Sequence, residues 1–311
     1  TVLVHRQPRG IWRIDYQLPA GETPAQALAV DALRQRIKAT LSMLGFADRP
    51  WELDWSSVYA ARTMTLADYR KGRVLFVGDA AHLLPIFGVR GANTAFQDAQ
   101  SLGWHLALVA RGWRDETVLD NFSQERVAAA REIIVESAKS TRFMAPPSEG
   151  YRLLRNAVLS LSLSQTFVGP LFHWRTLRAP VYRSSCFHVA GDDNALFETG
   201  PGQGESFLDI RLSNDQFLVD YLRGGFSLML YVALKELPAI LQVATRWREK
   251  GPGLKLIVIQ TEDLSPDALN LRLGDIDCFW NDEGGRLRRK YGLRTPGSRS
   301  EEHTSELQSQ R

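Results

Sequence analysis

Residues 72–93, GRVLFVGDAAHLLPIFGVRGAN, restrict what this chain can fold into more than any other segment. Residues 74–77 form an apolar run with the length and composition of a buried strand, and the run stops at Gly78 and Asp79. A glycine-rich turn then leads into a helical pattern at Ala95, Ala99, Leu102, Leu106 and Val109. Such a turn presents backbone N–H groups and the positive end of the helix dipole. The segment therefore predicts a strand, a turn and a helix that stabilise negative charge on a ligand.

The same residues resemble the second flavin-binding motif of the FAD-dependent aromatic hydroxylases, the single-component flavoprotein monooxygenases of the p-hydroxybenzoate and phenol hydroxylase type. In that family the motif reads G-R-V-x-L-x-G-D-A-A-H, then a proline, then G-x-x-G-x-N and an Asp-Ala pair. This chain differs in Phe76, which stands where the family has leucine. The matching residues are Gly72, Arg73, Gly78, Asp79, Ala80, Ala81, His82, Pro85, Gly88, Gly91, Asn93, Asp98 and Ala99.

The resemblance implies that this segment contributes to a FAD site. Asp79 is expected to hydrogen-bond the ribityl chain, and Pro85 is expected beside the isoalloxazine ring as the catalytic candidate. The N–H groups around Ala92 and Asn93 are expected to face the N1–C2 carbonyl edge of the flavin, where the helix end stabilises charge. No metal ligand is expected. The remaining cofactor-binding candidates are Arg73, Gly78, Gly88 and Gly91.

Four further polar residues have competing explanations. His82 is expected to bond backbone within its loop, and Asp98 to stabilise the first turns of its helix rather than touch a ligand. Arg13 and Arg90 are candidates for a substrate carboxylate, but a surface ion pair is the more common outcome for an arginine. Residues 2–8, 11–15 and 87–93 resemble most the branch around 3-(3-hydroxyphenyl)propanoate hydroxylase.

A second motif of the family does not occur in this sequence. Family members open with a strand, G-x-G-x-x-G and a helix, which hold the ADP half of FAD. Here no such fingerprint follows a strand, and Gly200-Pro201-Gly202-Gln203-Gly204 reads as a loop because no helical pattern follows it. We therefore expect the chain to be the C-terminal part of a larger flavoenzyme.

The segments around the motif predict mixed secondary structure. Residues 1–7 and 11–18 predict a hairpin, and Thr23 opens a helix through a capping box, with Gly45 as its stop. Residues 54–61 predict another strand. In the resembling enzymes these elements complete the substrate-domain sheet. From residue 115 to about 179 the pattern is helical, with a break at Pro146-Pro147.

After Pro180 the pattern changes to short alternating strands and helices, which predicts an α/β layer with a mixed sheet. The segments are residues 206–212, 214–222, 226–232, 236–249, 254–260 and 275–280. By position this part resembles the thioredoxin-like C-terminal domain of phenol-hydroxylase-type enzymes. Cys186 and Cys278 form no C-x-x-C pair, so dithiol chemistry is excluded. Packing or a homodimer contact is the expected role.

The predicted fold class is therefore α/β, with three segments. Residues 1–180 are the C-terminal part of a FAD-binding (Rossmann-like) domain with a substrate-domain sheet, and residues 181–297 are a thioredoxin-like α/β domain. Residues 298–311 resemble a translated sequencing-library adapter, and a native disordered tail is the alternative. The chain is then expected to be truncated at both ends.

Composition excludes two classes of partner. The net charge of +3 is too small to favour nucleic acid binding. No run approaches the roughly 18 apolar residues of a membrane span. The two cysteines are widely separated, as a reducing cytoplasm allows, and a cytoplasmic location is expected.

The function that the resemblance implies is FAD-dependent, NAD(P)H-consuming hydroxylation of a phenolic ring. The nicotinamide reduces the flavin, dioxygen forms a C4a-hydroperoxide, and the small aromatic substrate attacks its distal oxygen. The sequence does not separate NADH from NADPH. Two alternatives stay open: a non-catalytic remnant or interaction module, and a flavin monooxygenase that performs epoxidation or polyketide tailoring. The chain alone is expected to be inactive.

Overall fold

The computed structural model describes residues 2–87, 90–172, 179–188 and 201–207, followed by shorter pieces. These are residues 209, 211, 215, 217–222, 225–232, 239, 241–242, 245–246, 255–260 and 278–281. The chain divides into two compact units, Thr1–Arg178 and Ala179–Arg311. None of the helices in the described residues combines the length and hydrophobicity that a bilayer crossing needs.

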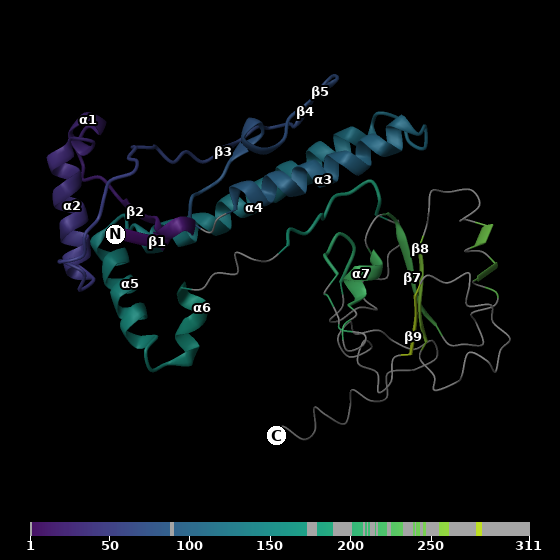
Figure 1. The fold of residues 1–311 in the computed structure, drawn as a ribbon. Helices are drawn as coiled ribbons and strands as arrows, with labels where there is room; N and C mark the ends of the chain where they lie inside the picture. The colour runs from purple at the N-terminus through teal and green to yellow at the C-terminus, as the bar shows by residue number, and fades with distance from the viewer. Residues whose placement is uncertain are drawn as a thin grey trace. The chain divides into compact units, whose positions relative to one another are not determined.

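The first unit opens with the predicted hairpin (Figure 1). Strand β1 (Val2–Arg6) pairs antiparallel with β2 (Trp12–Tyr16), in the register Val2↔Tyr16 to Arg6↔Trp12. The 3-10 turn η1 (Pro8–Gly10) connects them. Its last residue, Gly10, has a φ of 74°, which a glycine adopts at little cost. The hairpin predicted for residues 1–7 and 11–18 is therefore confirmed, with slightly shorter strands.

The helix predicted to run from Thr23 to Gly45 is in fact two helices, α1 (Pro24–Ala27) and α2 (Val30–Met43). The capping box is present, since the Thr23 hydroxyl accepts from the backbone N–H of Gln26 at 3.3 Å. The chain becomes extended at Ala29, and this bend turns α2 so that Arg36 pairs with Glu22 ahead of α1. The helical pattern in the sequence does not reveal the contact between Arg36 and Glu22, because it describes only neighbouring residues.

One strand prediction fails and another holds only in part, for the same physical reason. Residues 54–61 form no strand, and of residues 74–77 only β5 (Val74–Leu75) is one. A strand is stable only beside a partner that satisfies its N–H and C=O groups. In the described residues of this unit the remaining ladders are short pairs, β4–β5 and β3–β6, so no sheet extends to residues 54–61 or past Leu75 to residues 76–77. The short strands are β3 (Met64–Thr65), β4 (Arg70–Lys71) and β6 (His82–Leu83).

Long helices form the rest of the first unit, as predicted. Helices α3 (Gly91–Ala110) and α4 (Val118–Met144) pack side by side, and α5 (Glu149–Leu161) follows the break at Pro146-Pro147 (Figure 1). A 3-10 turn, η3 (Thr166–Val168), and the short α6 (Gly169–Phe172) end the described part of this unit.

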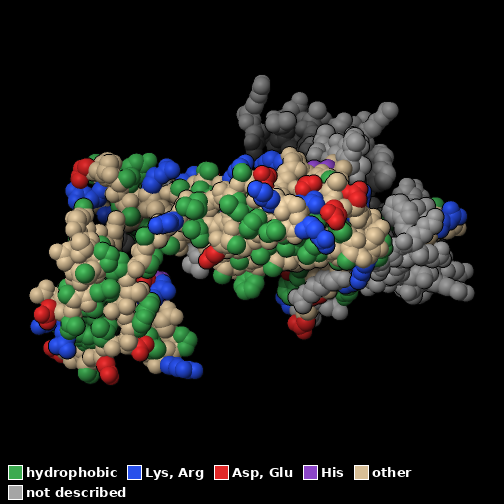
Figure 2. Space-filling model, turned by 90° about the horizontal axis from the view of Figure 1, so that it is seen from above, with side chains coloured by type: hydrophobic (Ala, Val, Ile, Leu, Met, Phe, Trp, Pro, Cys, Tyr) green, Lys and Arg blue, Asp and Glu red, His purple; other side chains and the backbone are tan. Residues whose placement is uncertain are grey.

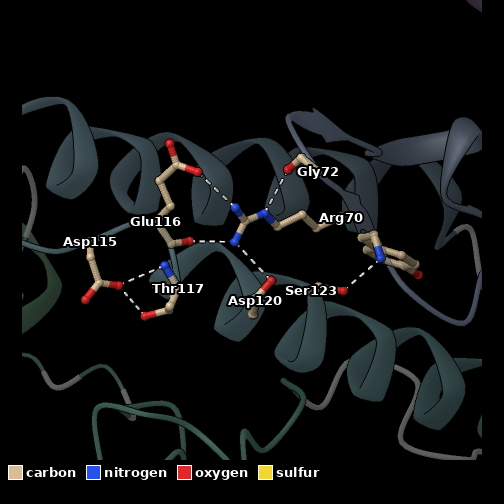
Figure 3. A network of polar contacts seen from close by, with 8 residues as sticks. Arg70, Gly72, Asp115, Glu116, Thr117, Asp120 and Ser123 are labelled. Atoms are coloured by element: carbon tan, nitrogen blue, oxygen red, sulfur yellow. Dashed lines mark hydrogen bonds and ion pairs between the residues drawn. The ribbon is translucent and has the colours of Figure 1, made fainter.

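Arg70 fastens the β4–β5 hairpin to the start of α4 (Figure 3). Its Nη1 donates to the carbonyl oxygen of Glu116 at 2.6 Å and to Asp120 Oδ1 at 3.0 Å, and its Nη2 lies 3.2 Å from Glu116 Oε2. The backbone N–H of Tyr69 donates to Ser123 Oγ at 2.8 Å. These contacts place the buried Tyr69 in an apolar core with Ala81, Phe122, Val127 and Ala130.

A polar network lies between α3 and α4, next to that core. The ring of His105 is fully buried, with Nδ1 2.8 Å from the carbonyl oxygen of Ser101. Asn121 Nδ2 lies 3.3 Å from His105 Nε2 and donates to Glu125 Oε1 at 2.9 Å. Burial lowers the pKa of His105 and outweighs the opposing effects of the Ser101 carbonyl and the Glu125 charge. The ring is therefore neutral, with Nδ1 donating and Nε2 accepting.

The second unit contains a parallel sheet of three described strands in the order β7-β8-β9. These strands are β7 (Ser227–Val232), β8 (Lys255–Gln260) and β9 (Cys278–Asn281). The strands predicted at residues 226–232 and 254–260 are confirmed. Of the strand predicted at residues 275–280, the described part belongs to β9, and residues 275–277 lie outside the described residues. Both described ladders are parallel, so this part of the sheet is not mixed.

The other predictions for this unit are only partly within the described residues. Helix α7 (Leu218–Leu222) occupies the end of residues 214–222. Of the strand predicted at residues 206–212, the described part holds one isolated bridge, Arg211↔Phe217. Most of residues 236–249, the side chain of Cys278 and residues 298–311 lie outside the described part, and Cys186 is exposed.

The neutral His105 predicts a pH dependence of stability. Its folded pKa lies below the ordinary value of 6.5, so the unfolded chain takes up the proton first. The stabilising effect is complete above about pH 6.5 and is lost as the pH falls below it, by up to about 1.4 kcal/mol per pH unit. Chemical denaturation between pH 7.5 and 5 should show this loss, and His105→Gln should reduce it. The exposed His5→Gln control should keep the parent profile; an unchanged profile in His105→Gln would rule out the assignment.

Candidate functional site

A buried glycine brings the turn after β5 against helix α3. This turn is the 3-10 segment η2 (Gly78–Ala80), and Gly78 has a φ of 58°. A Cβ atom added to Gly78 would lie 3.2 Å from the Cβ of Ala95 on α3. Both the backbone conformation and the close approach therefore favour glycine at this position. The next residue, Asp79, is exposed, so its carboxylate stays on the outer side of the contact.

The carboxylate of Asp98 joins the turn, β6, α3 and α4. Asp98 is completely buried on α3, and its Oδ2 accepts from the backbone N–H of Gly78 at 3.0 Å. The same oxygen lies 2.6 Å from His82 Nε2. The other oxygen, Oδ1, accepts from Arg126 Nε on α4 at 2.6 Å. Arg126 is also fully buried, and its Nη2 lies 3.4 Å from the carbonyl oxygen of Thr94.

These contacts keep Asp98 ionised. Burial alone would raise its pKa, but the hydrogen bond from His82, the charge and hydrogen bond of Arg126, and the Gly78 N–H together hold it below its usual 3.8. Because an ionised carboxylate only accepts, His82 carries a proton on Nε2. His82 Nδ1 is buried and has no hydrogen-bond partner in the described residues.

The roles predicted for His82 and Asp98 are therefore wrong in detail. His82 bonds a carboxylate instead of loop backbone, and Asp98 does not cap the first turns of α3. The reason is the helix start at Gly91, which places residue 98 about two turns inside the helix, on its buried face. The helical pattern over residues 115–179 did not identify Arg126 as the partner of Asp98, because periodicity does not show which side chains meet across two helices.

The glycine-rich turn ends at a helix start, as predicted. Helix α3 begins at Gly91, with Arg90 as its N-cap, and the N–H of Thr94 closes the first helical turn on the Arg90 carbonyl at 2.9 Å. The N–H groups of Gly91, Ala92 and Asn93 belong to the first turn, which lies outside the helix's own hydrogen-bond ladder. The side chains of Ala92 and Asn93 are exposed. This end of α3 carries the positive pole of the helix dipole toward its surroundings.

The two arginines proposed for a carboxylate ligand differ. Arg13 Nε pairs with Asp15 Oδ2 at 2.8 Å on the surface, so the ion-pair interpretation is confirmed for Arg13. Arg90 is half-buried, and its Nε is buried with no hydrogen-bond partner in the part of the chain that the structure describes. Burial lowers the pKa of its guanidinium. Within the described part of the chain, Arg90 forms no ion pair.

The other predicted site residues lie before and after the Gly78 turn in the sequence. Arg73 is exposed in the turn between β4 and β5, and Pro85 is buried after β6. Gly88 lies outside the described residues. The structure thus brings the Gly78 turn and α3 into contact, while the ligand roles of these residues stay predictions. The described residues contain no cluster of His, Cys, Asp and Glu suited to a metal ion.

Comparison with known proteins also indicates a FAD binding domain. Residues 4–137 match the family model of the FAD binding domain. A 3-(3-hydroxy-phenyl)propionate/3-hydroxycinnamic acid hydroxylase of Mycolicibacterium smegmatis is 27% identical over 88% of this chain and 49% of its own length. The Klebsiella pneumoniae protein of the same name is 33% identical over 86% of this chain and 48% of its own. The chain spans about half the length of the curated relatives it matches.

Two solved structures share the fold. The flavin-dependent monooxygenase PieE, in complex with FAD and substrate, aligns with a TM-score of 0.60 at 18% identity, over 84% of this chain and 50% of its own. BexE, studied for oxidation during BE-7585A biosynthesis, aligns with a TM-score of 0.54 at 21% identity, over 83% and 50%. At these identities the likeness is one of fold alone.

Breaking the Asp98–Arg126 pair should destabilise the first unit strongly. Asp98→Asn or Arg126→Met leaves an uncompensated buried charge or donor, at about 3–5 kcal/mol each. The double variant should lose much less than the sum, because neither charge is then buried alone. Urea denaturation measures all three, and Asp120→Asn, from an exposed pair, should cost below about 1 kcal/mol. Strictly additive losses would show that the two side chains do not interact.

Proposed function

We propose that this chain, whose residues 4–137 match the FAD binding domain family, is part of a flavin-dependent monooxygenase acting on a phenolic ring. The observation that carries the proposal is the start of α3, held against the Gly78 turn by the carboxylate of Asp98. The activity belongs to the whole protein, of which this chain is about half by comparison with its relatives.

The donors at the start of α3 fit a flavin. Reduced isoalloxazine carries negative charge along its N1–C2 edge, and the first-turn N–H groups of Gly91, Ala92 and Asn93 provide the positive end of a helix dipole. Arg90 adds a half-buried guanidinium at the same helix end, with a buried Nε that has no hydrogen-bond partner among the described residues. The buried charges of Asp98 and Arg126 are matched to each other, so neither competes for the ligand.

In the proposed site each residue binds the cofactor or orients it. Asp79, exposed beside the turn, accepts a hydrogen bond from a ribityl hydroxyl, and Pro85 borders the flavin ring. Gly78 allows the turn to approach α3, while Arg73, Gly88 and Gly91 complete the cofactor contacts. When bound, FAD supplies the redox chemistry: it takes two electrons from NADH or NADPH and uses dioxygen to hydroxylate the ring, with water as the second product.

The substrate class follows from the relatives' names. They are 3-(3-hydroxy-phenyl)propionate/3-hydroxycinnamic acid hydroxylases, so we propose a phenol with a short carboxylate side chain. We further propose a cytoplasmic location and a thioredoxin-like fold for the second unit. The parallel β7-β8-β9 sheet supports that fold, and without a C-x-x-C pair its role is packing or a homodimer contact.

The direct test joins this chain to the half of the Klebsiella pneumoniae relative that it does not match. With FAD, dioxygen and 3-(3-hydroxyphenyl)propionate, the joined protein should oxidise NADH or NADPH in a substrate-dependent way. Mass spectrometry should find a product that has gained one oxygen atom. Tight FAD binding without any such product for a set of phenols would contradict the proposed reaction.

Asp79→Ala in the joined protein should weaken FAD binding by about ten- to a hundredfold, the equivalent of one charge-assisted hydrogen bond. Excess FAD should restore part of the hydroxylation. Asp68→Ala, which removes another exposed carboxylate nearby, is the matched control and should leave the Kd for FAD unchanged. Flavin fluorescence titration measures both. Equal FAD affinity in Asp79→Ala and the parent would remove Asp79 from the site.

A further inference from the structure

Helix α3 has the reverse of the usual distribution of polar and apolar side chains. Its buried residues are Thr94, Asp98, Ser101, His105 and Leu108. The side chains of Asp98 and His105 bond polar groups, and Thr94 and Ser101 accept through their backbone carbonyl oxygens. The exposed face of the helix is a stripe formed by Ala92, Phe96, Ala99, Gly103, Leu106 and Ala110. In a helix that borders only water, the apolar face is normally the buried one.

The spacing shows that this apolar stripe is a single surface. Its members are separated by four, three, four, three and four residues, which places them along one side of the helix over its whole length. Phe96 is 75% exposed and Leu106 41% exposed. No charged side chain belongs to the stripe, and a Cβ atom added to Gly103 would meet nothing within 4 Å. Figure 2 shows that hydrophobic side chains reach the surface on the face of the molecule seen from above.

We propose that the apolar stripe of α3 is the surface on which the remaining half of the flavoprotein packs. Three observations support this occupant. The chain spans only about half the length of the relatives it matches, so a second half of similar size exists in them. A continuous apolar strip along a long helix is unfavourable in water and marks an interaction surface. The stripe also begins at Ala92, in the first turn of α3, so a partner on it reaches the candidate flavin site and completes it.

The stripe also defines the chemistry of its partner. Ala99 and Gly103, in the middle, let another backbone approach closely, whereas Phe96 and Leu106 on either side require recesses. The partner surface is therefore uncharged and apolar, close to the helix at its centre and hollowed near the two large side chains. The polar contacts on the other face, Asp98 with Arg126 and His105 with Asn121, keep α3 from rotating to bury the stripe against α4.

The inference rests on the proposed function only through the family assignment, so its test omits FAD and substrate. A single cysteine is introduced by Ala99→Cys on the stripe, or by Gln100→Cys at the adjacent exposed position on the flank of α3. Labelling by a maleimide is followed by peptide mass spectrometry, with the exposed Cys186 as internal rate standard. Rates are measured in the isolated chain, in the joined protein, and in a mixture of the chain with the separately produced second half.

In the isolated chain both introduced thiols should react at similar rates. In the joined protein, or in the mixture, the thiol at residue 99 should react at least tenfold more slowly, while that at residue 100 changes little. Equal rates at both positions in both formats would overturn the proposal. Protection of residue 99 in the isolated chain would also overturn the proposal. If that protection is lost on dilution, a second copy of the chain covers the stripe. If it persists on dilution, this chain's own residues cover it. If the joined protein binds FAD in the separate titration but residue 99 is not protected, the proposed function stands and this inference is removed.

Discussion

The ionised carboxylate of Asp98 is the contact on which the rest of the first unit depends. One side chain accepts hydrogen bonds from the backbone of the η2 turn, from His82 on β6 and from Arg126 on α4. A buried carboxylate and guanidinium cost several kcal/mol in desolvation, and only close, well-satisfied hydrogen bonds offset that cost. Here both oxygens are engaged within 3.0 Å, so the contact holds these segments in one arrangement.

That arrangement explains why α3 is polar inside and apolar outside. The buried face is occupied by the groups that fix the helix against the Gly78 turn and α4, so the apolar residues remain on the opposite side. The start of α3 then presents its first-turn N–H groups and Arg90 at one end, and the apolar stripe runs on from the same place. A ligand site and a packing surface are thus two consequences of one buried contact.

Local signals in the sequence predicted the local structure well. The hairpin around Pro8–Gly10, the Thr23 capping box and the helix start at Gly91 are each encoded by neighbouring residues, and the structure confirms them. The failures involve distant partners. The strand expected at residues 54–61 lacks a neighbour, and the partner of Asp98 lies 28 residues further on in Arg126. Residue periodicity carries no information on either contact, although Gly78, His82 and Asp98, which meet in the structure, all belong to the family motif.

The most direct test of this account is the amide hydrogen exchange of Gly78, measured by NMR in the unmodified chain. Its N–H group donates to Asp98 Oδ2, completely buried on α3. If that bond fixes the turn, the Gly78 amide exchanges only when the packing of the turn on α3 and α4 opens, as slowly as the amides in the middle of α4. Exchange of Gly78 at the rate of an exposed turn amide, while α4 remains protected, would contradict the central role of Asp98.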